Sequence, residues 1–318
     1  MPKKLYRSNG KLLLFGEYAV LDGAKALAIP TETGQTLEVK PHRGSDLIWE
    51  AYDVNGEPWF EAQISLYDFS SIRTSDDKTS KFIQKLLKGA VRYNTEFLNN
   101  WNGFKVINRL EFSRHWGLGS SSSVIANVAQ WADVNPFHLH FYVSNGSGYD
   151  IACAGASGPL TYQLLDDQLS YEEIDFEPGC LDNIYFVYLG RKANSGDAII
   201  HYTQKAKKRK SLAKQISVVT EKAVKCKGLK SLRAVIDEHE DIIATELGME
   251  KIKDKHFADF NGSIKSLGAW GGDFCMVATD QSAMEVKAYF KSKGLETIMS
   301  YDEMCLSYKP ELEKAVVA

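Results

Sequence analysis

The chain has 318 residues, 44% of them hydrophobic and 25% charged, and its 38 basic and 41 acidic side chains give a formal net charge of −3. These proportions are typical of globular proteins and exclude a disordered or fibrous chain. A net charge so close to zero gives no general attraction for nucleic acid or for an anionic membrane. Because single hydrophobic cores stop growing near about 250–300 residues, the length predicts two domains.

Cysteine spacing and hydropathy exclude further classes of protein. The five cysteines are far apart and form no C-x-x-C pair, so the sequence predicts neither a disulfide framework nor a zinc site. The apolar run 12–15 ends at Gly16 and Glu17, which makes it too short for the apolar region of a signal peptide. No stretch approaches the roughly 18 apolar residues of a membrane span. We therefore expect a cytoplasmic protein that binds neither membrane nor nucleic acid.

The first half of the chain predicts alternating strands and helices. Residues 11–30 indicate a strand, a turn and a second buried element, and residues 36–66 indicate a strand meander. Apolar positions recur at helical spacing over residues 80–98, where Ser80 is a candidate cap. Residues 104–112 follow as a strand, and a loop then leads into a helix that carries Val124, Ile125, Val128 and Ala129.

The second half predicts a buried strand over 184–189, helices over 209–225 and 229–247, a strand over 274–279, a helix over 281–293 and a strand over 296–308. Acidic residues and a proline accumulate between Leu165 and Asn183. We place the domain boundary there, which gives domains 1–175 and 176–318. The basic cluster at 205–210 indicates a solvated helix end more than a site for a polyanion.

The first glycine-rich segment is Gly117-Leu-Gly-Ser-Ser-Ser-Ser123, between a predicted strand and a predicted helix. A helix N-terminus presents free amides and the positive end of its dipole, which suits phosphate. The segment lacks the third glycine of a dinucleotide-binding motif and the lysine of a P-loop. A serine-rich loop that only caps a helix is the alternative.

Two more glycine-rich segments follow. In Gly146-Ser-Gly-Tyr-Asp150, the aspartate stands between a glycine turn and a run of small residues, where a carboxylate could accept a hydroxyl proton. The alternative for Asp150 is a turn or helix cap. Gly268-Ala-Trp-Gly-Gly-Asp273 leads into an apolar strand, and its glycines indicate close approach to a ligand or to another loop, with an ordinary turn as the alternative.

These segments, together with Asn9-Gly-Lys-Leu-Leu-Leu-Phe-Gly-Glu-Tyr-Ala-Val-Leu21, resemble the GHMP small-molecule kinases, which include galactokinase, homoserine kinase, mevalonate kinase and phosphomevalonate kinase. The four segments occur in the order of that family and span most of the chain. The resemblance implies an α+β fold with two domains, the first like domain 2 of ribosomal protein S5 and the second ferredoxin-like. It places the active site between them.

The resemblance also implies a role for each matching residue. Asp150 would be the catalytic aspartate, and Lys11 would lie near it and the transferred phosphoryl group. ATP would be held by Gly117, Leu118, Gly119, Ser120, Ser121, Ser122, Gly268, Ala269, Gly271, Gly272 and Asp273. Ser121 would be the hydroxyl ligand of Mg²⁺. Phosphoryl transfer depends mainly on positioning and charge neutralisation, which such a set of residues can supply.

The residues around Glu17 and Asp273 are more similar to phosphomevalonate kinases than to mevalonate kinases. On the acceptor side, the resemblance implies Glu17, Tyr18, Arg191, Lys192 and Ser195. We expect transfer of the ATP γ-phosphate to phosphomevalonate, with mevalonate as the alternative acceptor, by a monomer or a homodimer.

The sequence departs from the family pattern in the segment between Ser121 and Asp150. Its single acidic residue is Asp133, and Leu139 stands where a second Mg²⁺ carboxylate is expected. Magnesium would then depend on Ser121, the phosphates and water, an arrangement that Mg²⁺ tolerates. This departure, with the bulky Trp270, leaves open a ligand sensor that has the fold without the chemistry. The related ATP-consuming decarboxylase is a further alternative, against which Gly271-Gly-Asp273 argues.

Overall fold

The computed structural model describes residues 3–100, 102–166, 168–190, 195–206, 208–268 and 273–306, without the side chains of 195–198. Residue contacts divide the chain into two compact units. Unit 1 comprises Met1–Lys11, Thr33–Arg114 and Leu118–Gly155, and unit 2 comprises Leu12–Glu32, His115–Gly117 and Ala156–Ala318. Strands β1 (Lys4–Phe15) and β2 (Ala26–Pro41) contribute residues to both units. The domain boundary near residue 175 stays a prediction.

Unit 1 is built on a twisted sheet in the order β5-β4-β3-β6-β2. The other strands of this order are β3 (Asp46–Tyr52), β4 (Pro58–Ser65), β5 (Ser71–Thr74) and β6 (Phe104–Leu110), and β2 pairs with β6. The β3–β6 pair is parallel and the other pairs are antiparallel. Buried and half-buried residues alternate along β3, because one face of the sheet carries the core.

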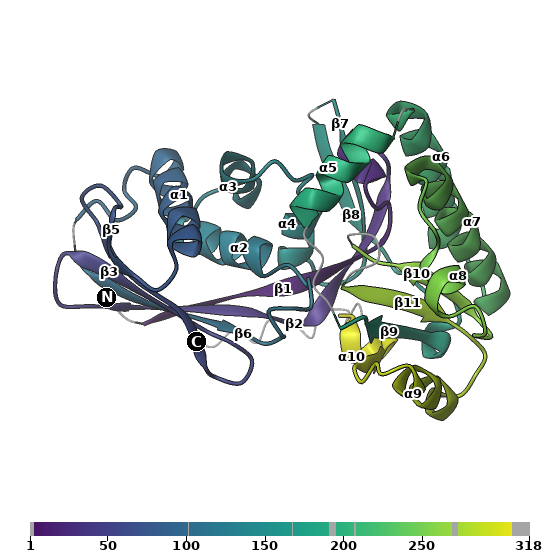
Figure 1. Ribbon diagram of the computed structural model, residues 1–318. Coiled ribbons are helices and arrows are strands. Elements are labelled where there is room, and N and C mark those ends of the chain that lie inside the picture. The colour runs from purple at the N-terminus through teal and green to yellow at the C-terminus, as the bar shows by residue number, and fades with distance from the viewer. Residues whose placement is uncertain are drawn as a thin grey trace, which may run out of the picture. The chain divides into compact units, whose positions relative to one another are not determined.

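Helices cover that face of the unit 1 sheet (Figure 1). They are α1 (Asp77–Tyr93), α2 (Ser120–Ala132), α3 (Pro136–Val143) and α4 (Tyr149–Gly155). The apolar residues expected in the helix after the serine loop do enter the core through α2. Helix α1 begins earlier than predicted, because the Asp76 carboxylate accepts the Thr79 N–H at 2.7 Å and caps it, while Ser80 is buried inside the helix.

Unit 2 contains an antiparallel sheet in the order β10-β11-β9-β12, and a hairpin that pairs with the first residues of β2. The sheet strands are β9 (Ile184–Tyr188), β10 (Ser263–Ser266), β11 (Phe274–Ala278) and β12 (Ile298–Ser300). The hairpin strands are β7 (Leu160–Leu165) and β8 (Gln168–Glu173). Alternate residues of β9 and β11 enter one core cluster, which helices α8 (Ile252–His256) and α9 (Ala283–Ser292) complete.

The helices of unit 2 are α5 (Ser195–Lys205), α6 (Arg209–Val224), α7 (Leu229–Leu247), α8 (Ile252–His256), α9 (Ala283–Ser292) and α10 (Tyr301–Met304). Two 3₁₀ turns, η1 (Ala19–Asp22) and η2 (Leu181–Asn183), join strands. The strand expected over 296–308 is short, because Ser300 and Glu303 form a capping box that starts α10. No helix in the described ranges is long and apolar enough to cross a membrane. The mixture of helices with mainly antiparallel sheets confirms the α+β class.

Candidate functional site

The serine-rich segment forms the N-terminus of α2. Gly119 is the N-cap residue, and its φ of 88° lies in the left-handed region that glycine adopts readily. A Cβ at this position would stand 2.8 Å from Ser122 Oγ and 2.9 Å from Lys11 Cγ, so space also requires glycine. The first amides of the helix have no partner within the helix, and the positive end of its dipole lies with them. This end of α2 can therefore hold an anion.

The four serines of this segment differ in exposure. Ser122 and Ser123 are buried, whereas the Ser121 side chain is exposed. The Ser122 hydroxyl donates to the Gly119 carbonyl at 2.8 Å, and the Ser123 hydroxyl donates to Gln35 Oε1. Ser120 is half-buried. The role of Ser121 as a metal ligand, which the resemblance implies, stays a prediction.

Lys11 lies directly against this segment. Its backbone N–H donates to the Leu118 carbonyl at 3.0 Å, and its alkyl chain packs over Gly119. The Lys11 ammonium stands 5.7 Å from the centre of the Tyr149 ring. The serine-rich segment and the segment that contains Tyr149 and Asp150 thus both lie near Lys11 within unit 1.

Asp150 lies at the start of α4, next to Tyr149, and is half-buried. Burial raises the pKa of Tyr149 to about 12, with Lys11 lowering it and Asp150 raising it. Burial likewise raises the pKa of the Cys153 thiol, with the Asp150 charge adding to that rise and the Lys11 charge opposing it. Both charges therefore act on the same two side chains, Tyr149 and Cys153.

The glycine-rich segment from Gly268 to Asp273 is described only at its two ends. The Asp273 carboxylate fills the space beside Gly117, where a Cβ would stand 2.3 Å from Oδ2, and it also lies against Gly268. Gly117, Gly268 and Asp273 therefore come together in unit 2. The predicted residues Ala269, Gly271 and Gly272 lie outside the described residues, as do Trp270, Arg191 and Lys192.

Glu17 is enclosed within unit 2, with only 3% of its surface exposed. Its Oε1 accepts a hydrogen bond from Lys265 Nζ on β10, and its Oε2 lies 3.2 Å from His239 Nε2 on α7. Glu240 follows on α7, and His239 Nδ1 lies 3.9 Å from Glu240 Oε1. We call Glu17, His239, Glu240 and Lys265 the buried quartet. The burial of Glu17 argues against the direct substrate contact that the resemblance implies, because its carboxylate is already paired inside the protein.

Burial and pairing set the charges of the buried quartet. For Glu17, burial acts to raise the pKa, but Lys265 and His239 together outweigh it and the pKa is lowered. Burial, assisted by Lys265, lowers the pKa of His239 to about 4. Burial raises the pKa of Glu240 to about 8, against the opposing effect of Lys265. Near neutral pH, one carboxylate and one ammonium therefore balance while His239 and Glu240 are neutral.

Glu240→Gln should make the unfolding free energy fall less as pH rises from about 5 to about 8. The folded-state pKa of about 8 lies above the unfolded value near 4.5, so the stabilisation from protonated Glu240 is complete below about pH 4.5 and is lost as pH rises through 8. The unfolding free energy of the variant minus that of the wild type should increase by about 1 kcal/mol per pH unit between about pH 5 and pH 8. Urea titrations at each pH measure this. Asp237→Asn, at an exposed position of α7, is the control, and an equal pH slope in Glu240→Gln and wild type would contradict the assignment.

Tyr18 links the predicted acceptor residues to α5. Its backbone has φ 59° and ψ −51°, a strained combination for a non-glycine residue, and its ring stacks on Tyr202 of α5 at 5.4 Å. The Tyr202 hydroxyl and the Arg209 guanidinium both donate to Asp22. Helix α5, which begins at Ser195, is thereby fixed to the turn that follows Tyr18. The Ser195 side chain itself is not among the described ones.

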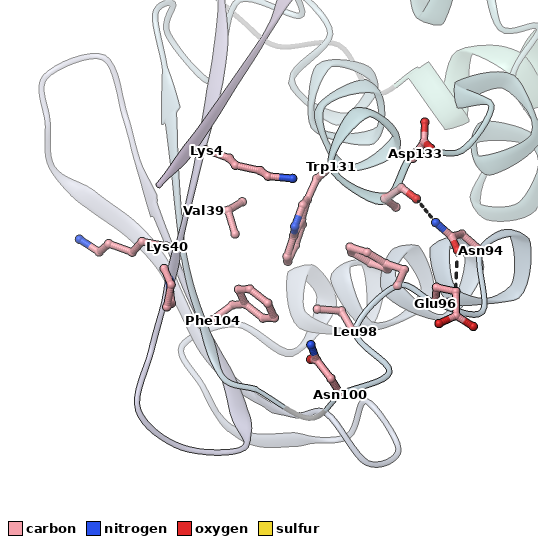
Figure 2. A pocket seen from close by; sticks show the side chains of 13 residues that line it. Lys4, Val39, Lys40, Asn94, Glu96, Leu98, Asn100, Phe104, Trp131 and Asp133 are labelled. Carbon is pink, nitrogen blue, oxygen red and sulfur yellow. Dashed lines mark hydrogen bonds between the residues drawn. The ribbon is translucent and has the colours of Figure 1, made fainter. Parts of the chain in front are cut away.

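A cavity of about 210 Å³ lies in another part of unit 1 (Figure 2). Its walls include Phe97, Phe104 and Trp131, and the Trp131 ring meets the other two edge-on at 4.8 and 5.7 Å. In Figure 2, Lys4 extends toward Trp131 while Lys40 points away. Trp131 belongs to the last turn of α2, about 17 Å along the helix from its N-terminus. The cavity is therefore separate from the anion-binding end of α2.

The comparisons with known proteins agree on the fold. No protein family and no curated protein matches the sequence. Among solved structures, the mevalonate kinase of Methanococcus jannaschii matches with a TM-score of 0.68 at 17% identity, over 94% of this chain and 97% of that one. The phosphomevalonate kinase of Streptococcus pneumoniae, in complex with phosphomevalonate and AMPPNP, matches with a TM-score of 0.70 at 16% identity, over 93% and 99%. The galactokinase of Lactococcus lactis, complexed with galactose, matches with a TM-score of 0.66 at 14% identity, over 92% and 89%.

All three structures belong to kinases named in the resemblance above, and each match spans nearly the whole of both chains. At identities this low, a structural match establishes the architecture and leaves the substrate open. The chain therefore has the GHMP kinase fold, as its four sequence motifs predicted.

Proposed function

We propose that this protein is an ATP-dependent small-molecule kinase that transfers the γ-phosphate of ATP to phosphomevalonate. The observation that carries the proposal is that three sequence segments lie close together within unit 1: the one with Lys11, the serine-rich segment and the one with Asp150. Lys11 packs over Gly119 at the N-terminus of α2, and Asp150 lies beside Tyr149, whose ring the Lys11 ammonium approaches. An anion-binding helix end, a cation and a carboxylate are the parts that phosphoryl transfer needs.

Each of these parts has a role in the proposed reaction. The amides of Ser120–Ser122 would bind phosphate oxygens of the nucleotide. The Lys11 ammonium would neutralise charge on the transferred group, where a fixed positive charge is most effective in a site that excludes water. Asp150 would orient the acceptor and take up its proton where the acceptor group carries one.

Magnesium fits these residues in part. Ser121 presents an exposed hydroxyl at the helix end, and Asp133 is the C-cap of α2, at the opposite end of that helix. No group of three or more His, Cys, Asp or Glu side chains among the described residues could hold a metal ion. Bound Mg²⁺ would neutralise phosphate charge, with Ser121, the phosphates and water as its ligands.

The choice of phosphomevalonate rests on the sequence around Glu17 and Asp273 and on the similarity to the structure that contains phosphomevalonate. A coupled assay of ADP release should show turnover with phosphomevalonate that exceeds turnover with mevalonate. Turnover of mevalonate alone would move the assignment to the alternative acceptor. Nucleotide binding without turnover of either compound, or of galactose or homoserine, would favour the ligand sensor.

Lys11→Met should lower kcat by about 10²–10³-fold, because methionine keeps the alkyl packing over Gly119 but removes the charge from the transferred phosphoryl group. Steady-state kinetics with a thermal melt separate this loss from unfolding. Lys4→Met, an exposed position of the same strand, is the matched control and should leave kcat unchanged. A kcat within threefold of wild type in Lys11→Met would remove Lys11 from the mechanism.

A further inference from the structure

The carbonyl of Gly119, the N-cap residue of α2, accepts a side-chain hydrogen bond in addition to the first backbone bond of the helix. The Ser123 N–H donates to it at 3.0 Å, which is the first bond of the helix. The Ser122 hydroxyl donates to it at 2.8 Å, and the Ser123 Oγ lies 3.0 Å away. Since the Ser123 hydroxyl has one proton and donates it to Gln35, Ser122 is the side chain that holds this carbonyl.

This carbonyl determines the direction of the next amide. A trans peptide is planar, so its C=O and N–H point in opposite directions. The Gly119 oxygen points inward, along the helix and toward two buried serines. The Ser120 N–H, which belongs to the same peptide, must then point out of the helix end, where an anion would bind.

We propose that Ser122 is a positioning residue: its hydroxyl holds the Gly119–Ser120 peptide so that the Ser120 N–H faces the bound phosphate, and the Ser122 side chain does not contact the nucleotide. The inference rests on the proposed function, since it concerns the same phosphate loop. It changes the role of Ser122, which the resemblance places among the ATP ligands. Burial of this side chain supports the change, because only 3% of its surface is exposed.

Two buried polar side chains, Ser123 and Asn127, lie one turn apart on the face of α2 that packs against β1 and β2. Gln130 follows them and is exposed, and its amide donates to the Ser8 hydroxyl at 3.2 Å. The Asn127 amide donates to the Gln35 carbonyl at 2.9 Å and accepts from the Ser8 hydroxyl at 2.9 Å. Because the side chains of Ser123 and Asn127 are both bonded to these strands, they fix the start of α2 against β1 and β2.

The test compares Ser122→Ala and Ser122→Thr with the wild type. Calorimetry measures the Kd for MgATP and, without metal, the Kd for tripolyphosphate as an anion probe. We expect Ser122→Ala to raise both dissociation constants about tenfold. A threonine hydroxyl can also bond to the carbonyl three residues earlier, so Ser122→Thr should restore most of the binding. The KM for the acceptor should stay the same in both variants.

Ser231→Ala is the matched control. Ser231 donates to the carbonyl of the N-cap Gly228 of α7 at 2.8 Å, which is the same bond at the same position of another helix. Its loss should leave both dissociation constants unchanged. Equal binding by Ser122→Ala and wild type would overturn the inference, as would equally weak binding by the alanine and threonine variants. A wild type that binds neither probe would instead contradict the proposed function.

Discussion

Asp150→Asn should lower kcat by about 10²–10⁴-fold while the Kd for MgATP stays within a factor of about three. Asparagine preserves the shape of the side chain at the start of α4 but cannot accept a proton or balance the charge of Lys11. The carboxylate acts on the same region as Lys11, as the opposing effects of the two charges on the pKa values of Tyr149 and Cys153 indicate. The expected loss is therefore electrostatic and chemical, with nucleotide binding retained.

Steady-state kinetics and calorimetry on the same preparation measure both quantities. Asp133→Asn is the control, because Asp133 is the single acidic residue between Ser121 and Asp150 and caps the far end of α2. The Asp133 variant should have a kcat within a factor of about two of the wild-type value. If Asp150→Asn keeps near-wild-type turnover, or if the Asp133 variant loses as much, Asp150 has no part in the reaction.

Lys265→Met should destabilise the protein by about 3–5 kcal/mol, because it leaves the Glu17 carboxylate buried without its cation. Lys265 is fully buried, and its ammonium bonds to Glu17 and to the Ser266 carbonyl at 3.1 Å. The Lys265 ammonium also opposes the effect of burial on Glu17. Removal of the cation should therefore make Glu17 take up a proton or unfold the unit.

The double variant Glu17→Gln with Lys265→Met distinguishes pairing from packing. With both charges gone, most of the lost stability should return, since a buried pair replaced by neutral groups is often close to neutral in its effect. Chemical unfolding of the wild type, both single variants and the double variant gives the coupling energy. Lys251→Met, which breaks an exposed pair with Asp241, should cost less than about 1 kcal/mol. Additive losses in the double variant would show that the buried quartet is not coupled.

The long helices and the fold could be predicted from sequence because each depends on local information. Helices α6 and α7 follow their predicted ranges closely, since apolar residues recur at helical spacing along them. The serine-rich segment begins a helix as expected, because glycine and serine set the start of α2. The order of the four motifs was sufficient to predict the GHMP kinase fold, which the structural matches confirm.

The contacts between buried polar side chains could not be predicted from sequence. Glu17, His239 and Lys265 are separated by more than 200 positions at their extremes, so their pairing exists only in the fold. Gln35 and Asn127 were also missed, although one signal was present. Ser123 and Asn127 lie at helical spacing among apolar residues of α2, and buried polar residues in this arrangement indicate partners on neighbouring strands.

The central claim is that Lys11, the N-terminus of α2 and Asp150 form a site that transfers a phosphoryl group to a small molecule. Its most direct test uses ATP labelled with ¹⁸O in the γ-phosphate and mass spectrometry of the acceptor. Phosphomevalonate incubated with the wild type should gain one labelled phosphoryl group, and with Asp150→Asn it should gain almost none although the nucleotide is bound. Label that stays with ATP for every acceptor offered, or equal transfer by the two proteins, would contradict the claim.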